Sequence, residues 1–346
     1  MIMKTCLRLI VLLMMSKVVF GQAKPSYTQY VLNNYILNPA ISGIENYTDL
    51  KFSYRNQWTG ISGSPKTTYL TIHQPLGKEM REGTSPTSFT PKGVNPRGNE
   101  YWTSYTAPPA HHGAGLQLVN DRAGYINRWS LAGTYAYHKP MGKKTTLAAG
   151  FSLAISSVSL DREKMYFATL DPNDPAIGYA SNELSKIKPE IGAGLFLYSS
   201  KYFAGISVLN IVPGKNRFVK NDTNGAFYTP NLFVTGGYRF ALDDNFTLLP
   251  SIMIQHWQPQ LYGVHVNAKL QYQDLLWAGG SYRYSDLISG YAAYTGINIS
   301  NALNITYSYE VSATSRLRNY TGNTHEILIG VILGNKYGDS CPRNIW

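Results

Sequence analysis

The chain has 346 residues, of which only 15% are charged, and it contains 27 tyrosines and 31 glycines. Roughly 25% of the residues of a soluble globular protein are charged, so this composition disfavours an ordinary soluble domain. The formal net charge is +11, but the lysines and arginines are dispersed along the chain instead of forming the basic face or tail that nucleic acids bind, so no nucleic-acid partner is expected.

Residues 1–21 have the composition of an export signal. Basic residues precede an apolar run over residues 9–15, and a small residue closes the segment. Lys17 interrupts the apolar stretch, so the roughly 20 apolar residues that a membrane-spanning helix needs are not available. We therefore expect residues 1–21 to be removed as a signal peptide. Cys6 would leave with them, and Cys341 alone can form neither an intramolecular disulfide nor a cysteine metal cluster.

The stretch YTQYVLNNYILNPAISG, residues 27–43, is rich in tyrosine and asparagine. Its phenol and amide groups can hydrogen-bond to a polar wall while its leucines and isoleucines pack among themselves. The density of large side chains disfavours the alternative, a disordered tail. We predict that residues 22–49 form a plug or docking segment, and the residues assigned to it are Tyr27, Tyr30, Asn33, Asn38 and Pro39.

From residue 50 onward, the sequence consists of short segments in which every second residue is apolar, aromatic or small. The clear segments are 129–137, 147–155, 246–254, 264–272, 276–284, 303–309 and 327–333, and the weaker ones are 50–58, 66–76, 113–121, 189–198, 202–211, 230–241 and 288–299. The total of about fourteen is even, as a single-chain bacterial barrel requires. The pattern predicts an all-β fold: one transmembrane antiparallel β-barrel over residues 50–334 in a lipid bilayer, followed by a tail over residues 335–346.

The connections between these segments alternate in length. Those in the even register are short turns, as expected at the periplasmic end of a barrel, whereas the longer connections 159–187, 212–229 and 311–323 fall in the odd, extracellular register. The proline-rich residues 77–112 break this rule, because a short periplasmic turn is expected there. They are either a periplasmic binding loop or a lumenal insert, with a solvated loop of no special role as the alternative.

The stretch YRNQWTGISGSPKT, residues 54–67, ends the first predicted strand and turns into the second. Our hypothesis is that Arg55 faces the lumen and hydrogen-bonds to the plug segment. Trp58 is interpreted as an aromatic residue at the membrane interface, and the same role is predicted for Trp129 and Trp277.

Several stretches of the chain also resemble a known family. They are YTQY with NPAISG (27–43), YRNQWTGISGSPKTTYLTIHQPL (54–76), GLQLVNDRAGYINRWSLAGTYAYH (115–138), LWAGGSYR (276–283), ITYSYE (305–310) and HEI (325–327). In this order they resemble the PorP/SprF family of outer-membrane proteins associated with type IX secretion and gliding motility in Bacteroidota. The length of the 77–112 insert is the clearest departure.

The resemblance implies a non-enzymatic role in the outer membrane of a Gram-negative bacterium. Family members accompany large surface proteins, such as motility adhesins, and are thought to help export this client or to hold its C-terminal domain at the cell surface. Others associate with periplasmic components of the type IX machine. The alternative from a different class is a diffusion or substrate-specific porin.

Motifs for catalysis or cofactor binding are weak. The pair His111–His112 has no third ligand at a useful spacing, so a structural role is favoured over a metal site. The stretch DPNDP, residues 171–175, lacks the glycine and glutamate of a calcium-binding loop. Nucleophile-elbow, P-loop and zincin motifs are absent from the sequence. We expect neither an enzyme nor a cofactor.

Overall fold

The computed structural model describes residues 30–77, 105–160, 185–212, 214–216, 226–228, 230–243, 245–258, 261–273, 275–285, 289–300, 302–313 and 322–334. Three single-turn 3-10 helices come first: η1 (Tyr30–Leu32), η2 (Asn34–Ile36) and η3 (Pro39–Ile41). The strands are β1 (Thr48–Asn56), β2 (Lys66–Leu76), β3 (His111–Ala123), β4 (Ile126–Pro140), β5 (Thr146–Leu160), β6 (Ser185–Tyr198), β7 (Tyr202–Leu209), β8 (Gly214–Asn216), β9 (Ala226–Tyr228), β10 (Asn231–Tyr238), β11 (Phe240–Ala241), β12 (Phe246–Gln258), β13 (Leu261–Tyr272), β14 (Leu276–Ser285), β15 (Gly290–Ser300), β16 (Leu303–Ser312) and β17 (Thr324–Leu333).

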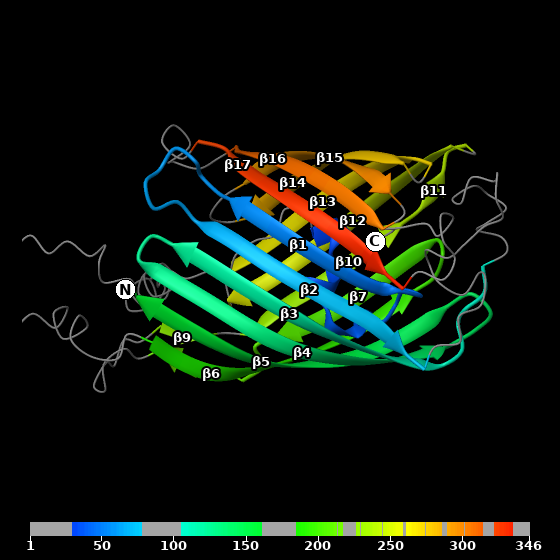
Figure 1. Ribbon diagram of the computed structural model, residues 1–346, viewed down its shortest axis with the longest axis horizontal. Helices are drawn as coiled ribbons and strands as arrows, with labels where there is room; N and C mark the ends of the chain where they lie inside the picture. The colour runs from blue at the N-terminus through cyan, green and yellow to red at the C-terminus, as the bar shows by residue number, and fades with distance from the viewer. Residues whose placement is uncertain are drawn as a thin grey trace, which may run out of the picture.

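These strands form one closed antiparallel barrel (Figure 1). Neighbouring strands of the ring follow one another along the chain, except that β7 pairs with β10 across the β8–β9 connection and β10 pairs with β12. The pairing of β1 with β17 closes the ring. The short β11 follows β10 and pairs with the same neighbour, β12, so the two strands make one stave and the barrel has fourteen. The predicted fold class is therefore confirmed. Strands β8 and β9 form a separate hairpin in the connection between β7 and β10.

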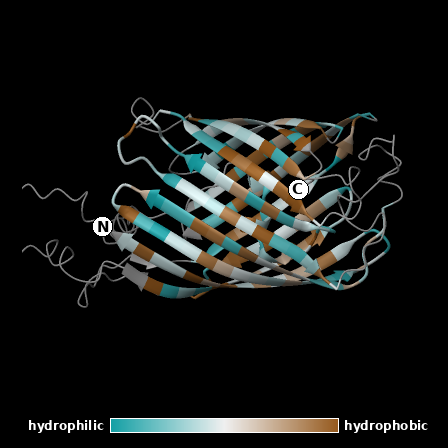
Figure 2. Cartoon of the chain, viewed as in Figure 1, coloured by the Kyte–Doolittle hydropathy of each residue, from teal (hydrophilic) through white to brown (hydrophobic). Residues whose placement is uncertain are grey.

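The two faces of the strands differ in polarity. In β4, Leu131, Tyr135 and Tyr137 are exposed on the outer face, whereas Thr134 and His138 are buried on the inner face. The same alternation recurs around the barrel and appears as alternating brown and paler blocks along the strands in Figure 2. An apolar exterior around a polar interior is the pattern of a barrel that crosses a membrane, because lipid contacts one face of every strand.

The two ends of the barrel can be told apart by their connections. At one end, three strand pairs are joined across residues 199–201, 273–275 and 301–302, whereas at the other end β5 and β6 are separated by residues 161–184. Short turns mark the periplasmic end of such barrels, so β1 runs from the periplasmic to the extracellular end.

Exposed aromatic side chains gather near both ends, as expected where a barrel meets the two membrane interfaces. Toward the extracellular end they are Tyr54, Tyr262, Tyr282, Tyr284, Tyr291, Tyr307 and Tyr309. Toward the periplasmic end they are Tyr137, Tyr238, Phe240, Phe246 and Tyr272.

One boundary of the predicted segments changes the placement of a candidate site. Strand β3 begins at His111, so the pair His111–His112 belongs to the barrel wall and not to the 77–112 insert. The sequence signal was hidden because Pro108 and Pro109 lie only one residue before the strand. Residues 1–29, which include the predicted signal peptide and Tyr27, lie outside the described residues, as do 78–104, 161–184 and 335–346. No helix of the described residues is long and apolar enough to span a bilayer.

Candidate functional site

Residues 30–47, called the N-terminal segment here, lie inside the barrel. In Figure 1 parts of this segment are visible in blue between the front strands. Nearly every one of its side chains is buried, and Ala40 is completely so. Most of its apolar side chains divide between two clusters, one with Phe196, Tyr198 and Phe203 of the wall and one with Phe233 and Met253. Tyr47 packs separately against Ile332. Because the segment is buried, the barrel wall supplies most of the contacts that hold it in place.

Asn38 and Pro39 organise the turn that starts η3. The Asn38 side-chain oxygen accepts a hydrogen bond from the backbone N–H of Ala40 at 3.0 Å, as an N-cap does, and Pro39 occupies the first helical position. The other end of the same carboxamide donates to the carbonyl of Leu195 in β6 at 3.0 Å. One side chain thus shapes the segment and attaches it to the wall.

Further hydrogen bonds join the N-terminal segment to several strands. They are Asn33 Nδ2 to Thr71 Oγ1 at 3.0 Å, Tyr35 Oη with Thr134 Oγ1 at 2.6 Å, Gln117 Nε2 to the Tyr35 carbonyl at 2.9 Å and Ser207 Oγ to the Leu37 carbonyl at 2.6 Å. Burial raises the pKa of Tyr35 to about 12, so its phenol stays protonated at neutral pH. These bonds satisfy polar groups that would otherwise be costly to bury.

Three inward-facing histidines surround the Ser42–Gly43 peptide near the periplasmic end. The Nε2 atoms of His138 and His111 lie 2.7 Å from the Ser42 carbonyl and 3.2 Å from the Gly43 carbonyl, and the Gly43 N–H donates to His73 Nδ1 at 3.3 Å. The rings of His111 and His138 are stacked 4.5 Å apart. This arrangement fixes the N-terminal segment just before the chain enters β1.

The sequence pair His111–His112 is divided between the two faces of β3. While His111 points inward, His112 points outward and its Nδ1 lies 2.6 Å from the Tyr135 hydroxyl. Within the part of the chain that the structure describes, no group of three histidine, cysteine, aspartate or glutamate side chains is arranged to hold a metal ion.

Inward-facing glycines let the N-terminal segment approach the wall closely. A Cβ atom on Gly150 of β5 would lie 2.6 Å from the Cα of Ala40, and one on Gly113 of β3 would overlap the Ser42 carbonyl. A Cβ on Gly194 of β6 would collide with the Asn38 side chain. These glycines were not predicted from the sequence, although their position on the inner face of predicted strands was a usable signal.

Arg55 faces the lumen, in a network of buried charges on the wall. Its guanidinium lies 2.9 Å from Glu310 Oε2 and 3.7 Å from Glu326 Oε2, and Arg283 also pairs with Glu310. Ser53 donates to Glu326 at 3.0 Å. The hydrogen bond from Arg55 to the plug segment that the sequence suggested stays a prediction.

The three predicted interface tryptophans differ in their surroundings. Trp129 is exposed on the outer face of β4, and Trp58 is half-buried in the β1–β2 turn; for both, the interface role stays a prediction. Trp277 is only 3% exposed and packs in the interior cluster with Tyr30 and Tyr294. The prediction that it lies at the membrane interface is therefore wrong. Trp277 directly follows the outward-facing Leu276 in β14, and successive side chains of a strand point to opposite faces, so Trp277 points inward.

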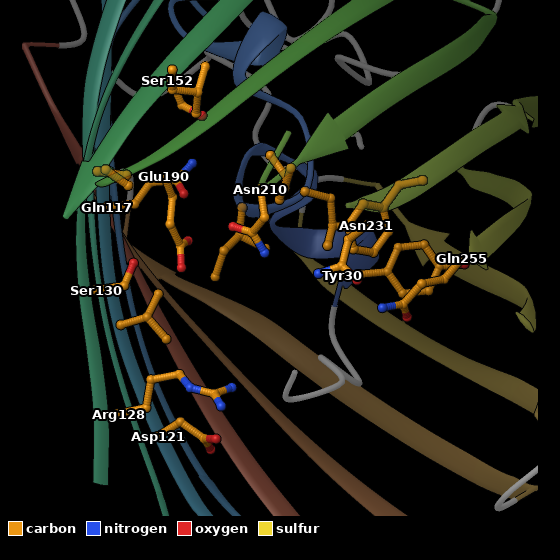
Figure 3. A pocket seen from close by; sticks show the side chains of 18 of the residues that line it. Tyr30, Gln117, Asp121, Arg128, Ser130, Ser152, Glu190, Asn210, Asn231 and Gln255 are labelled. Atoms are coloured by element: carbon orange, nitrogen blue, oxygen red, sulfur yellow. The ribbon is translucent and has the colours of Figure 1, made fainter. Parts of the chain in front are cut away.

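A cavity lies on the extracellular side of the N-terminal segment. It contains about 980 Å³ of space, counting the part open to solvent, and Tyr30, Ile36 and Leu37 line it from the segment. Figure 3 shows polar side chains from several strands around it. Asp121 and Arg128 flank the β3–β4 turn at the extracellular end, which places the cavity in that half of the barrel.

Comparisons with known proteins identify the family. The chain matches the family model described as "Type IX secretion system membrane protein PorP/SprF" over residues 19–331. None of the curated proteins matches the chain.

Among solved structures, the chain is similar to Omp33 of Acinetobacter baumannii, with 8% identity, a TM-score of 0.46 and coverage of 84% of this chain and 100% of that chain. It is also similar to the toluene transporter TbuX of Ralstonia pickettii, with 10% identity, a TM-score of 0.46 and coverage of 92% and 96%. A closed barrel with an apolar exterior is suited to the bacterial outer membrane, where we place the protein. From the match over most of its length, the chain belongs to the PorP/SprF family of type IX secretion system membrane proteins.

Proposed function

We propose that the protein is a non-enzymatic scaffold that supports secretion and surface anchoring of a large type IX-exported protein, such as a gliding adhesin, by binding its C-terminal domain. Family membership supports a role in this secretion system. The observation that carries the proposal is the occupied interior: buried residues 30–47 are hydrogen-bonded to strands around the barrel. A lumen filled in this way suits a rigid support better than a conduit.

In this proposal the N-terminal segment is a plug. Tyr30, Asn33, Asn38 and Pro39 are the residues of the predicted plug that belong to the described part of the chain, and all four are buried in the barrel. Periplasmic components of the type IX system would bind the periplasmic end, through the segment that precedes the plug or through the 77–112 insert. The client would bind the extracellular loops, whose ends the closed sheet holds in place.

Deletion of the gene tests the client-binding role. We expect the client to disappear from the cell surface, as measured by antibody labelling of intact cells, and to return when the wild-type gene is supplied on a plasmid. Immunoblots of the culture medium would distinguish a client that is released from one that is not exported. A client that remains on the surface of the deletion strain at its normal level would contradict the proposal.

Conductance in planar bilayers tests the porin alternative. We expect the purified protein to show no ohmic channel, because the N-terminal segment occupies the lumen. A steady open conductance from the intact protein would favour the porin instead.

A further inference from the structure

We propose that the cavity above the N-terminal segment is a binding site for an extended, neutral peptide segment of the secreted client, with an apolar side chain directed at the cavity floor. This inference rests on the proposed function and names the contact through which the client would be held. Part of the cavity is open to solvent, and apolar and polar side chains together line it, as is typical of ligand sites.

Two unpartnered carboxamides are the first observation. Asn231 of β10 and Gln255 of β12 line the cavity and are 5% and 7% exposed. Neither side chain has a hydrogen-bond partner among the described residues. A carboxamide carries both donors and an acceptor, and so does the peptide backbone, so the two groups are matched to a peptide bond.

The apolar lining is the second observation. Ile36 and Leu37 of the N-terminal segment meet Phe233 and Met253 of the wall in one buried cluster, and all four side chains line the cavity. An apolar side chain that enters this space is removed from water, which is favourable in proportion to the area buried. The combination of an apolar floor with carboxamides on the wall favours a peptide over an ion.

The charged groups of the cavity are engaged within the wall. Asp121 accepts a hydrogen bond from Thr67 at 2.8 Å and is directly opposite Arg128 in the β3–β4 ladder. Glu190 accepts from Ser156 at 2.7 Å. Because these charges already have protein partners, binding a strongly charged segment would require breaking existing contacts, and a neutral segment is preferred.

The position of the cavity determines from which side its occupant comes. Tyr30, Ile36 and Leu37 line it from the N-terminal segment. Asp121 and Arg128 line it beside the β3–β4 turn at the extracellular end, so we expect a segment to enter from that end. At the extracellular end, an exported protein can supply the peptide that binds in the cavity. The bound segment would touch the N-terminal segment directly.

Photocrosslinking in living cells identifies the occupant. The photoreactive amino acid p-benzoylphenylalanine is placed at Ala154, which lines the cavity, and in a matched strain at Ile155, which faces outward. We expect the Ala154 position to crosslink to a peptide from the C-terminal domain of a type IX-exported protein, identified by mass spectrometry, and the Ile155 position not to do so. Equal crosslinking from both positions, or none of this peptide from Ala154, would overturn the proposal.

Filling the cavity tests whether the contact matters. Ala154→Trp is compared with Ile155→Trp, and folding of both barrels is checked by their heat-modifiable mobility. We expect Ala154→Trp to reduce the surface-displayed client about tenfold, the change that 1.4 kcal/mol of binding free energy produces, and Ile155→Trp to have no effect. If Ala154→Trp does not fold, the double variant Asn231→Leu with Gln255→Leu replaces it. We expect this double variant also to reduce the amount of client displayed at the surface.

The two levels of the hypothesis fail differently. If gene deletion removes the client but a folded cavity-filled variant displays it normally, the cavity is a solvent-filled vestibule only and this inference is wrong, while the scaffold function stands. If deletion itself leaves display intact, the scaffold function is wrong.

Discussion

Single residues on the inner face of the wall determine how closely the N-terminal segment packs. Gly113, Gly150 and Gly194 each contact this segment where a Cβ atom would collide with it. Glycine weakens a strand because it adds no side chain to pack. At these positions the missing side chain is useful, because it lets the wall approach the N-terminal segment closely.

Replacement of one of these glycines should loosen the segment. We expect Gly150→Ala to lower the free energy of unfolding by about 1–3 kcal/mol, the usual cost of overpacking, because its Cβ would meet Ala40 at 2.6 Å. Hydrogen exchange of residues 30–47 should also become faster. The matched control is Gly133→Ala, whose nearest neighbour would be 4.0 Å away. Equal stability of the two variants would show that the segment adjusts freely.

Arg55 is the second residue whose replacement should be costly. It is paired with Glu310 and Glu326 in the interior, so Arg55→Ala leaves buried carboxylates with less compensation and should cost about 3 kcal/mol of stability in chemical denaturation. Lys139→Ala, at an exposed position, is the control. The same variant tests the predicted contact with the plug: unchanged hydrogen exchange of residues 30–47 would mean that Arg55 serves only the wall.

At the scale of elements, the N-terminal segment is the part that cannot be stable alone. Its helices η1, η2 and η3 have three residues each, far below the roughly 12 residues at which an isolated helix becomes marginal in water. The wall supplies the missing partners, including the histidines that surround Ser42 and Gly43. The strands depend on the segment less, because their backbone groups are paired around the ring.

Removal of the segment should therefore open the barrel without unfolding it. We expect a variant that lacks residues 22–43 to keep the circular dichroism of a β-barrel and to show a steady conductance in planar bilayers. The intact protein measured in parallel is the control. A variant that assembles correctly yet remains silent would show that other parts of the chain close the lumen.

At the scale of the whole molecule, closure of the sheet removes the edges that would otherwise pair with other chains. The pairing of β1 with β17 achieves this. Closure also fixes the two faces: the exterior meets lipid everywhere, and the interior holds the charged and amide groups. The extracellular connections and the cavity remain as surfaces that a partner can reach.

The cost of a charge on the outer face depends on its depth in the bilayer. Leu153 lies at the middle of β5 and is exposed on the outer face, so Leu153→Arg should lower stability in lipid vesicles by about 2–4 kcal/mol, the cost of a basic residue near the bilayer midplane. At its outward neighbour nearer the extracellular end, Ile155→Arg should cost less. If both changes were tolerated equally, the assignment of the apolar band would be wrong.

The fold was predictable from the sequence to a large extent. All fourteen predicted segments correspond to staves of the barrel, because lipid outside and polar groups inside impose a period of two on every strand. The same period, applied to β14, would have placed Trp277 inside, since Leu276 and Tyr282 already defined the outward face. The error arose because Trp277 was assigned to the membrane interface from its residue type alone, without asking which face of the strand it is on.

The sequence by itself determined the number of strands, their order, their lipid-facing sides and the family, since each of these is encoded in neighbouring residues. Only the tertiary structure decided where residues 30–47 lie, which glycines make room for them, and that Arg55 meets Glu310 from 255 residues away in the chain. Local periodicity specifies which face of a strand is inward. Which side chains then meet across the lumen depends on the closure and register of the whole barrel, and no short stretch of sequence contains that information.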